Sequence, residues 1–290
     1  MAMNLDLSVL RSLVAIVRNG SFARAAERVG RSESAVSLQL KRLEEQVGQK
    51  MFRRAGRNML LTDAGERMLA YAERLVALND EAVIEVAGRR LEGTVRLGVP
   101  PDFAETWLQT VLARFGRICP SVDIRTTIER SPALTALFGR GELDLAMSFA
   151  TGEVDHATWS GSIPMAWIGT PSYVRRSEDP VRLAVFDPPC LFRAAATAVL
   201  DSHGISWSVG FKSSSLAGLW AAVAAGFGVT VRTPEGIPPQ LTVLGEAAGL
   251  PKLPSTALAL LQHSRPSSPA AAQLAEVLID TLTATLGGSI

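Results

Sequence analysis

The sequence predicts a mixed α/β protein with an N-terminal helix-turn-helix head, a long connecting helix and an α/β body. Three observations support this fold class. In the first 50 residues, apolar side chains recur at helical spacing around a tight glycine turn. A longer apolar stripe flanked by charges follows over residues 63–86. From Thr94 onward, short apolar runs alternate with amphipathic helical segments, which is typical of a parallel sheet covered by helices.

The length and composition are those of a globular protein with two or three domains. The chain has 290 residues, of which 20% are charged and 47% are hydrophobic. The amino terminus lacks a basic segment followed by an apolar core, so no export signal is expected. The longest run without charge or strong polarity, Leu216–Val231, is too short and too rich in glycine to span a bilayer. We therefore expect a cytoplasmic protein without a membrane partner.

The charge distribution is uneven along the chain. Residues 1–62 hold eleven Lys or Arg against five Asp or Glu, a formal charge of +6. The whole chain carries +1, so residues 63–290 carry −5. A small basic head on a mildly acidic body indicates a polyanionic partner for the head alone.

The head reads as three helices followed by a basic hairpin. The first helix ends at Asn19-Gly20, and Ser21 caps a short second helix. Gly30-Arg31 forms the turn, and Ser32 begins a third helix that stops at Gly48. The apolar stripe of this third helix consists of Val36, Leu40, Leu43 and Val47. Two short extended arms around Ala55-Gly56 follow it, forming a wing with clustered basic residues.

The outward face of the third helix predicts a duplex-DNA interface. Short polar side chains in its first turns can reach base edges, while lysines and arginines there and on the wing contact phosphates. The helix N-terminus adds backbone amides for a phosphate oxygen. The candidate DNA-contacting residues are Ser32, Glu33, Ser34, Ser37, Leu38, Gln39, Lys41, Arg42, Arg53, Arg54 and Arg57.

The connecting helix carries a heptad-like seam. Apolar residues alternate at spacings of four and three, with charged residues on the other side: Ala64, Met68, Tyr71, Leu75, Leu78 and Ala82. The seam either packs on the chain's own surface or joins two subunits. We favour a dimer, because a helix between two domains has little of its own chain to cover it. The candidate dimer contacts are Met68, Tyr71, Leu75 and Leu78.

A ligand site is expected in the body, where ligands bind outside the carboxyl ends of strands. The candidate effector-binding residues are Pro101, Asp102, Phe103, Ser131, Phe149, Cys190, Arg193, Ser213 and Ser214. Several have simpler interpretations: Ser131 as a helix cap, Phe103 and Phe149 as buried core, and Arg193 as a surface residue. Cys190 is either a packing residue or a redox-sensing thiol near a helix start.

No catalytic or metal-binding pattern is present in the sequence. Cys119 and Cys190 alone make neither a disulfide framework nor a zinc site. The three histidines, His156, His203 and His263, stand apart without metal spacing, and no nucleophile, base and acid order is recognisable. We therefore expect no enzyme, no metal and no cofactor.

Residues 5–65 resemble the winged helix-turn-helix domain of LysR-type transcriptional regulators. The resemblance is carried by the runs SFARAAERVGRSESAVSLQLKRLEEQVGQKMFRR and LLTDAGE. It implies that Ser32–Val47 enters the major groove, that the wing lies along the neighbouring minor groove, and that the connecting helix pairs two subunits. Tetramers are also suggested by the resemblance. This chain has Glu33 where members usually carry Gln, and Leu38 where Arg is common, so base preference cannot be carried over.

The body is similar to the effector-binding domain of the same family. The runs GELDLAM and SSLAGLWAAVAAGFGVTV carry this resemblance. It implies a two-lobed α/β domain like a periplasmic-binding protein, with crossovers near Pro164 and Ser255, and an unidentified small-molecule effector. Relatives often place Ser or Thr after the first strand, where this chain has Pro100-Pro101-Asp102. Asp102 is expected to cap the following helix itself and to repel an anion.

The predicted protein is thus a DNA-binding regulator that responds to a small-molecule effector and works as a homo-oligomer. We expect a winged helix-turn-helix domain over residues 1–62, a linker helix over 63–91 and an effector-binding domain over 92–290. Within the last, the first lobe takes about 92–163 and 263–290, and the second about 164–262. The alternatives are a cytosolic two-lobed solute-binding or receptor protein and a redox-sensing regulator acting through Cys190.

Overall fold

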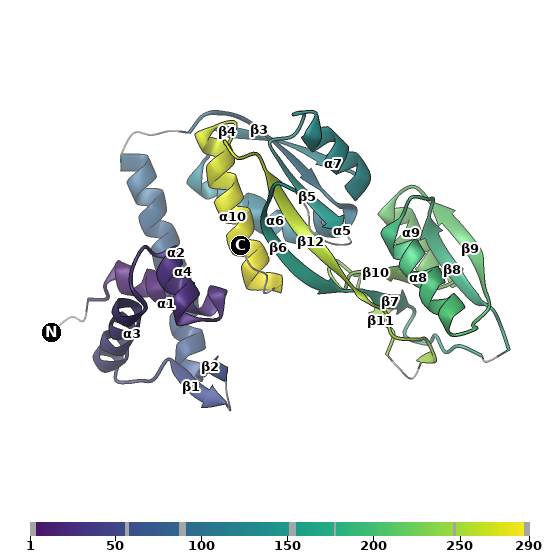
Figure 1. Cartoon of the computed structure of the whole chain (residues 1–290), viewed down its shortest axis with the longest axis horizontal. Coiled ribbons are helices and arrows are strands. Elements are labelled where there is room, and N and C mark those ends of the chain that lie inside the picture. The colour runs from purple at the N-terminus through teal and green to yellow at the C-terminus, as the bar shows by residue number, and fades with distance from the viewer. Residues whose placement is uncertain are drawn as a thin grey trace. The chain divides into compact units, whose positions relative to one another are not determined.

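The structure is a computed structural model that describes residues 4–55, 58–86, 91–150, 155–176, 178–245 and 248–286. Figure 1 shows an N-terminal unit formed mainly by residues up to Glu92 and a C-terminal α/β unit that begins at Gly93. Each unit is described by itself. In the described ranges, no helix combines the length and the apolar character needed to cross a bilayer.

The N-terminal unit contains the predicted helix-turn-helix and hairpin. Helix starts use the expected side chains: Asp6 accepts from Ser8 N, Ser21 from Arg24 N and Ser32 from Ala35 N. Gly20 and Gly48 end the first and third helices in the left-handed conformation. The elements are α1 (Leu7–Asn19), α2 (Phe22–Arg28), α3 (Glu33–Val47), β1 (Phe52–Ala55), β2 (Asn58–Leu61) and α4 (Asp63–Val86).

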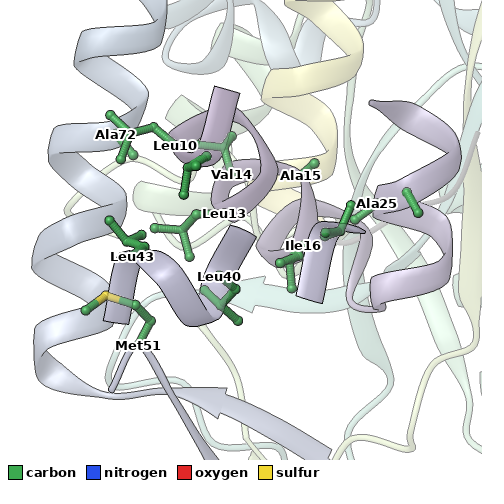
Figure 2. Packing of buried hydrophobic residues seen from close by; sticks show 13 residues of the cluster. Leu10, Leu13, Val14, Ala15, Ile16, Ala25, Leu40, Leu43, Met51 and Ala72 are labelled. Carbon is green, nitrogen blue, oxygen red and sulfur yellow. The ribbon is translucent and has the colours of Figure 1, made fainter. Parts of the chain in front are cut away.

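The core of this unit joins the first turns of α4 to the helix-turn-helix. Figure 2 shows Leu10 and Leu13 of α1, Leu40 and Leu43 of α3, and Ala72 of α4 in one cluster. The stripe predicted for α3 is therefore its buried face. A Cβ on Gly65 would lie 2.1 Å from the carbonyl oxygen of Met51, so only glycine allows α4 to approach the wing this closely.

An ion pair also ties α4 to α1. The Arg11 guanidinium donates to both carboxylate oxygens of Asp80. This hydrogen bond raises the pKa of Arg11. Together with the shared core, the pair sets the direction in which α4 leaves the head.

The first lobe of the C-terminal unit is built on a five-stranded sheet in the order β4-β3-β5-β12-β6. β3 runs parallel to β4 and β5, whereas β12 runs antiparallel to β5 and β6. The strands are β3 (Gly93–Val99), β4 (Val122–Ile128), β5 (Leu145–Ala150), β6 (Ala157–Pro164) and β12 (Ser255–Gln262). The helices are α5 (Pro101–Ala104), α6 (Trp107–Ile118), α7 (Ser131–Gly139) and α10 (Pro269–Leu286).

The second lobe contains two smaller sheets joined by a bridge. β10-β7-β11 is antiparallel, β8 and β9 are parallel, and a bridge between Leu183 and Val229 links the two sheets. The strands are β7 (Ala166–Gly169), β8 (Val181–Phe186), β9 (Trp207–Ser213), β10 (Thr230–Arg232) and β11 (Thr242–Val243). The helices are α8 (Leu191–Ser202) and α9 (Leu216–Ala224).

Two expectations for the body are wrong. The sheet of the first lobe is mixed rather than parallel, because β12 and the unpredicted β6 run against their neighbours. The second lobe does not extend to residue 262, because Ser255–Gln262 pairs along its length with β5 and β6 of the first lobe. The chain passes between the lobes on either side of a hydrogen bond from Met165 N to Pro254 O, 3.2 Å long.

Candidate DNA interface and effector cavity

The exposed face of α3 presents hydroxyls, the acids Glu33 and Glu45, and two basic side chains. The Ser32 hydroxyl caps the helix and lies 3.0 Å from the Ser34 hydroxyl. Lys41 lies 3.7 Å from Glu45 on the next turn, a solvent-exposed pair of little energetic weight. The exposed predicted residues of this face are Ser32, Glu33, Ser34, Ser37, Leu38, Lys41 and Arg42.

Gln39 does not belong to that face, and its predicted DNA contact is contradicted. The side chain is buried, its Oε1 accepts from the Ser12 hydroxyl at 2.7 Å, and its Nε2 donates to the Ser8 hydroxyl at 3.3 Å. Gln39 therefore holds α3 against α1. Its position next to the apolar stripe was the available signal, because a buried amide needs partners on a neighbouring helix.

The wing places Arg53 and Arg54 on β1, and both are exposed. Lys50, before the wing, is held by Glu44: Nζ lies 2.7 Å from the carboxylate, and this hydrogen bond raises the pKa of Lys50. Glu44 also accepts from the backbone N–H of Met51 at 2.9 Å, which fixes the start of the wing to α3. The predicted contact Arg57 lies outside the described residues.

The seam of α4 divides between two faces. Ala64 and Met68 pack on the core of the head, so Met68 is not part of an open surface. Tyr71, Leu75 and Leu78 are exposed, with 40% of Leu75 and 60% of Leu78 accessible to solvent. Three large apolar side chains therefore remain uncovered by the chain itself over the middle of the helix.

A cavity of about 680 Å³ opens between the two lobes of the C-terminal unit. Five of the predicted effector residues line it: Pro101, Asp102, Ser131, Phe149 and Cys190. The first-lobe residues come from the ends of β3 and β5 and from α7, and the second-lobe residues from the end of β8, the start of α8 and the end of β10. The carboxyl ends of strands thus form the walls, as expected for open α/β units.

The Ser131 hydroxyl forms a hydrogen bond with the protein's own backbone. It accepts from the N–H of Phe149 at 2.8 Å and does not cap α7, whose cap residue is Arg130. The hydroxyl oxygen still carries a proton that it can donate. Two further hydroxyls on the same wall, those of Thr135 and Ser148, lie 3.1 Å apart.

Four predicted effector residues lie elsewhere. Phe103 is fully buried, with its ring edge-on to Trp107, and Arg193 donates to the carbonyl of Phe186 at 3.5 Å. The Ser213 hydroxyl closes a turn by donating to Ser215 O, and Ser214 belongs to the same turn. Neither serine lines the cavity, so the expected convergence of the β9 end with the other strand ends is wrong.

Arg232 is the functional candidate that the sequence reasoning missed. It ends β10 and forms a buried ion pair with Asp102 across the lobes: Nε donates to Oδ1 at 2.8 Å, and Nη2 donates to Oδ2. Asp102 therefore does not cap α5, contrary to expectation. The sequence does indicate a special role for Arg232, because it directly follows the apolar run GFGVTV and a charge at the end of a buried strand requires a partner.

The three histidines are expected to stand apart, but two of them lie close together in the structure. The ring of His263 stacks on Phe138 at 4.1 Å between centroids, and the rings of His156 and His263 are 6.2 Å apart. His156 and Phe138 also line the cavity. Within the described ranges, however, His, Cys, Asp and Glu form no group of three suited to a metal ion.

The two cysteines are free thiols in different surroundings. Cys119 is buried, and burial raises the pKa of its thiol. Cys190 is half-buried, is the N-cap residue of α8 and lines the cavity.

Comparisons with known proteins agree with this architecture. The family model "Bacterial regulatory helix-turn-helix protein, lysR family" matches residues 7–66, and "LysR substrate binding domain" matches residues 88–283. The HTH-type transcriptional regulator PecT of Dickeya dadantii is 39% identical over 255 residues, covering 88% of this chain and 80% of that protein. The HTH-type transcriptional regulator DgdR of Burkholderia cepacia is 36% identical over 265 residues, covering 91% and 90%. The solved structure of CrgA, a LysR-type regulator from Neisseria meningitidis, matches with a TM-score of 0.58 at 22% identity, covering 97% and 99%. These matches exclude an enzyme and a simple solute receptor, and the chain belongs to the LysR family of DNA-binding transcriptional regulators.

Proposed function

We propose that this regulator binds duplex DNA through the exposed face of α3 and the wing, as a dimer joined along α4. We also propose that a small organic effector in the interlobe cavity changes that complex. The observation that carries the DNA contact is the exposed row of α3 side chains together with the exposed Arg53 and Arg54 of the wing, on a head of charge +6. Binding to chromosomal DNA would place the protein in the cytoplasm.

The roles on DNA divide by chemistry. Ser34 and Ser37 are short, exposed and near the start of α3, so they are assigned to base edges. Glu33 is assigned to a cytosine amino group, the base donor that a carboxylate accepts from. Lys41, Arg42, Arg53 and Arg54 are assigned to phosphates, which position the head without reading sequence.

Replacing Arg53 and Arg54 together with alanine is expected to weaken binding to all DNA sequences alike. Each lost phosphate contact lowers the slope of log affinity against log salt by about 0.9, so the slope should fall by about two units. Fluorescence anisotropy with operator and random duplexes, at several salt concentrations, measures both slopes.

The matched control is the removal of two exposed arginines from the C-terminal unit, Arg125 and Arg176. This control changes the net charge by the same amount and should leave the slope unaltered. A wing variant that keeps the wild-type slope would contradict the phosphate assignment.

The dimer proposal is supported by the uncovered apolar face of α4. Tyr71, Leu75 and Leu78 follow heptad spacing on that face, as in a helix that packs against a copy of itself. A two-fold dimer would present two α3 helices to one DNA duplex. A tetramer, suggested by the family resemblance, remains a further proposal.

The effector proposal is supported by the fact that both lobes contribute residues to the walls of the cavity. Both lobes contribute, so a bound ligand contacts each of them and can favour one arrangement of the lobes over another. A ligand changes the regulator only through different affinities for its two states, with a coupling of about 1–3 kcal/mol. Oxidation of Cys190 is the alternative signal, and a peroxide response lost in Cys190→Ser would favour it.

Filling the cavity with Thr135→Trp is expected to abolish the effector response while folding and DNA binding persist. Thr135 is an exposed α7 residue that lines the cavity, so an indole there takes ligand space without entering the core. A metabolite screen by thermal shift identifies ligands, and operator footprinting with each ligand compares the variant with wild type.

Ala133→Trp supplies the control, since Ala133 is exposed on the same helix and does not line the cavity. It should respond as wild type does. An effector that shifts the footprint equally in all three proteins would place its site outside the interlobe cavity.

A further inference from the structure

The interlobe cavity already contains a carboxylate bound to an arginine, and both groups belong to the protein. Asp102 follows β3 in the first lobe, Arg232 ends β10 in the second, and each is only 3% exposed. Two of the three guanidinium nitrogens of Arg232, Nε and Nη2, donate to the two oxygens of Asp102. A carboxylate ligand could therefore make a bidentate contact only at the Nη1–Nη2 edge, on a guanidinium whose charge Asp102 already balances.

Arg232 is also fixed by aromatic rings. Its guanidinium carbon lies 4.7 Å from the ring centre of Phe186 and 4.3 Å from that of Phe192, so two cation–π contacts add to the ion pair. Within the described part of the chain, the third nitrogen, Nη1, has no hydrogen-bond partner. Arg232 lines the cavity, so Nη1 is the nitrogen of this guanidinium that remains for a ligand.

The remaining cavity wall is mainly apolar and rich in rings. Its ring-bearing residues, apart from His156, are Phe138, Phe149, Phe186, Phe192, Pro100, Pro101, Pro132 and Pro189. The other charged residues of the wall are Arg130, whose Nη1 donates to the carbonyls of Asp187 and Pro189, and Asp155, which is exposed. Such a wall suits a flat, largely apolar ligand held by few polar contacts.

We propose that Asp102 excludes carboxylates and that the cavity selects an uncharged, ring-bearing effector whose acceptor oxygen binds Nη1 of Arg232. This inference rests on the proposed function, in which the interlobe cavity is the effector site. A carboxylate ligand would either displace Asp102, leaving it buried without a partner, or crowd a second negative charge around the same guanidinium. Both arrangements are strongly unfavourable in a buried site. A neutral amide or ester keeps the ion pair and satisfies the free donor.

Three naphthalene derivatives of similar shape test the charge preference on the purified full-length protein. They are naphthalene-2-carboxamide, methyl naphthalene-2-carboxylate and the naphthalene-2-carboxylate anion. Calorimetric titration at neutral pH should show the amide and the ester binding at least about tenfold more tightly than the anion, which corresponds to about 1.4 kcal/mol. Asp102→Asn removes the negative charge and one of the two acceptors from the arginine, so the preference should reverse in favour of the anion.

The wild-type comparison stands even if Asp102→Asn fails to fold, because the ester and the anion differ only in charge and one methyl group. An anion that binds wild type as tightly as the amide would overturn the inference and leave the cavity as the effector site. Failure of both neutral compounds to bind would overturn the ring-bearing class. Equal binding of the neutral compounds to wild type and to Thr135→Trp would instead contradict the proposed function, because the site would lie elsewhere.

Discussion

Substitution of Leu75 and Leu78 together by aspartate is expected to yield a monomer that has lost tight operator binding. In a dimer joined along α4, the two aspartates would be buried without partners, at a cost of several kcal/mol. Losing the second DNA-binding head should lower operator affinity by about 100-fold or more, because two linked heads gain from their high effective concentration. Sedimentation velocity measures the mass, and anisotropy measures operator binding.

Both leucines are exposed in the single chain, so the double variant should keep its fold. Arg67→Gln with Ala70→Asp is a suitable control: it lowers the net charge by the same amount at exposed positions on α4. This control should stay dimeric and bind normally. If the leucine variant kept the mass of wild type, the dimer would be formed by another surface.

Replacing Arg232 alone by methionine is expected to destabilise the C-terminal unit by about 3–5 kcal/mol, because Asp102 is left buried without its counter-charge. For a domain of this size the loss lowers Tm by about 10 °C. Replacing both partners, with Asp102→Leu and Arg232→Met, should restore most of the stability, since no unpaired charge remains. All five tryptophans lie between Trp107 and Trp220, so their fluorescence follows this unit during unfolding.

Arg140→Met provides the control for the arginine substitution. Arg140 pairs with Glu142 on the surface, where both side chains are more than half exposed, and its loss should cost less than about 1 kcal/mol. An Arg232→Met variant as stable as Arg140→Met would show that the buried pair contributes nothing to joining the lobes.

The head could be predicted in detail because its signals are local. Ser21, Ser32 and Gly48 cap helices within a few residues of their partners, and the α3 stripe follows the helical period. Gln39 is the exception. The spacing on α3 places it on the buried face, but its partners Ser8 and Ser12 lie about thirty residues away, so the sequence does not show what its amide binds.

The body could be predicted only in outline, because its decisive contacts are distant in the sequence. Asp102 and Arg232 are separated by 130 positions, and only the folded arrangement of the lobes brings them together. The strand β6, ATWSGSIP, was missed because its glycine, serines and proline carry little strand propensity. Its pairing with β12 forms it, and that pairing also determines where the second lobe ends.

Arg232 lies beside the point where the chain crosses between the lobes. In the β10–β7 ladder Arg232 stands opposite Ala166, the residue that follows the crossover hydrogen bond from Met165 to Pro254. The ion pair is therefore close to the crossover, whereas β9 lies beyond β8 in the other sheet of the lobe. A rotation of the second lobe about the crossover would turn a small change in the distance between Asp102 and Arg232 into a larger displacement at β9. If the proposed effector acts on this ion pair, we expect its effect to be larger at β9, the outer strand of the β8–β9 sheet, than at the pair itself.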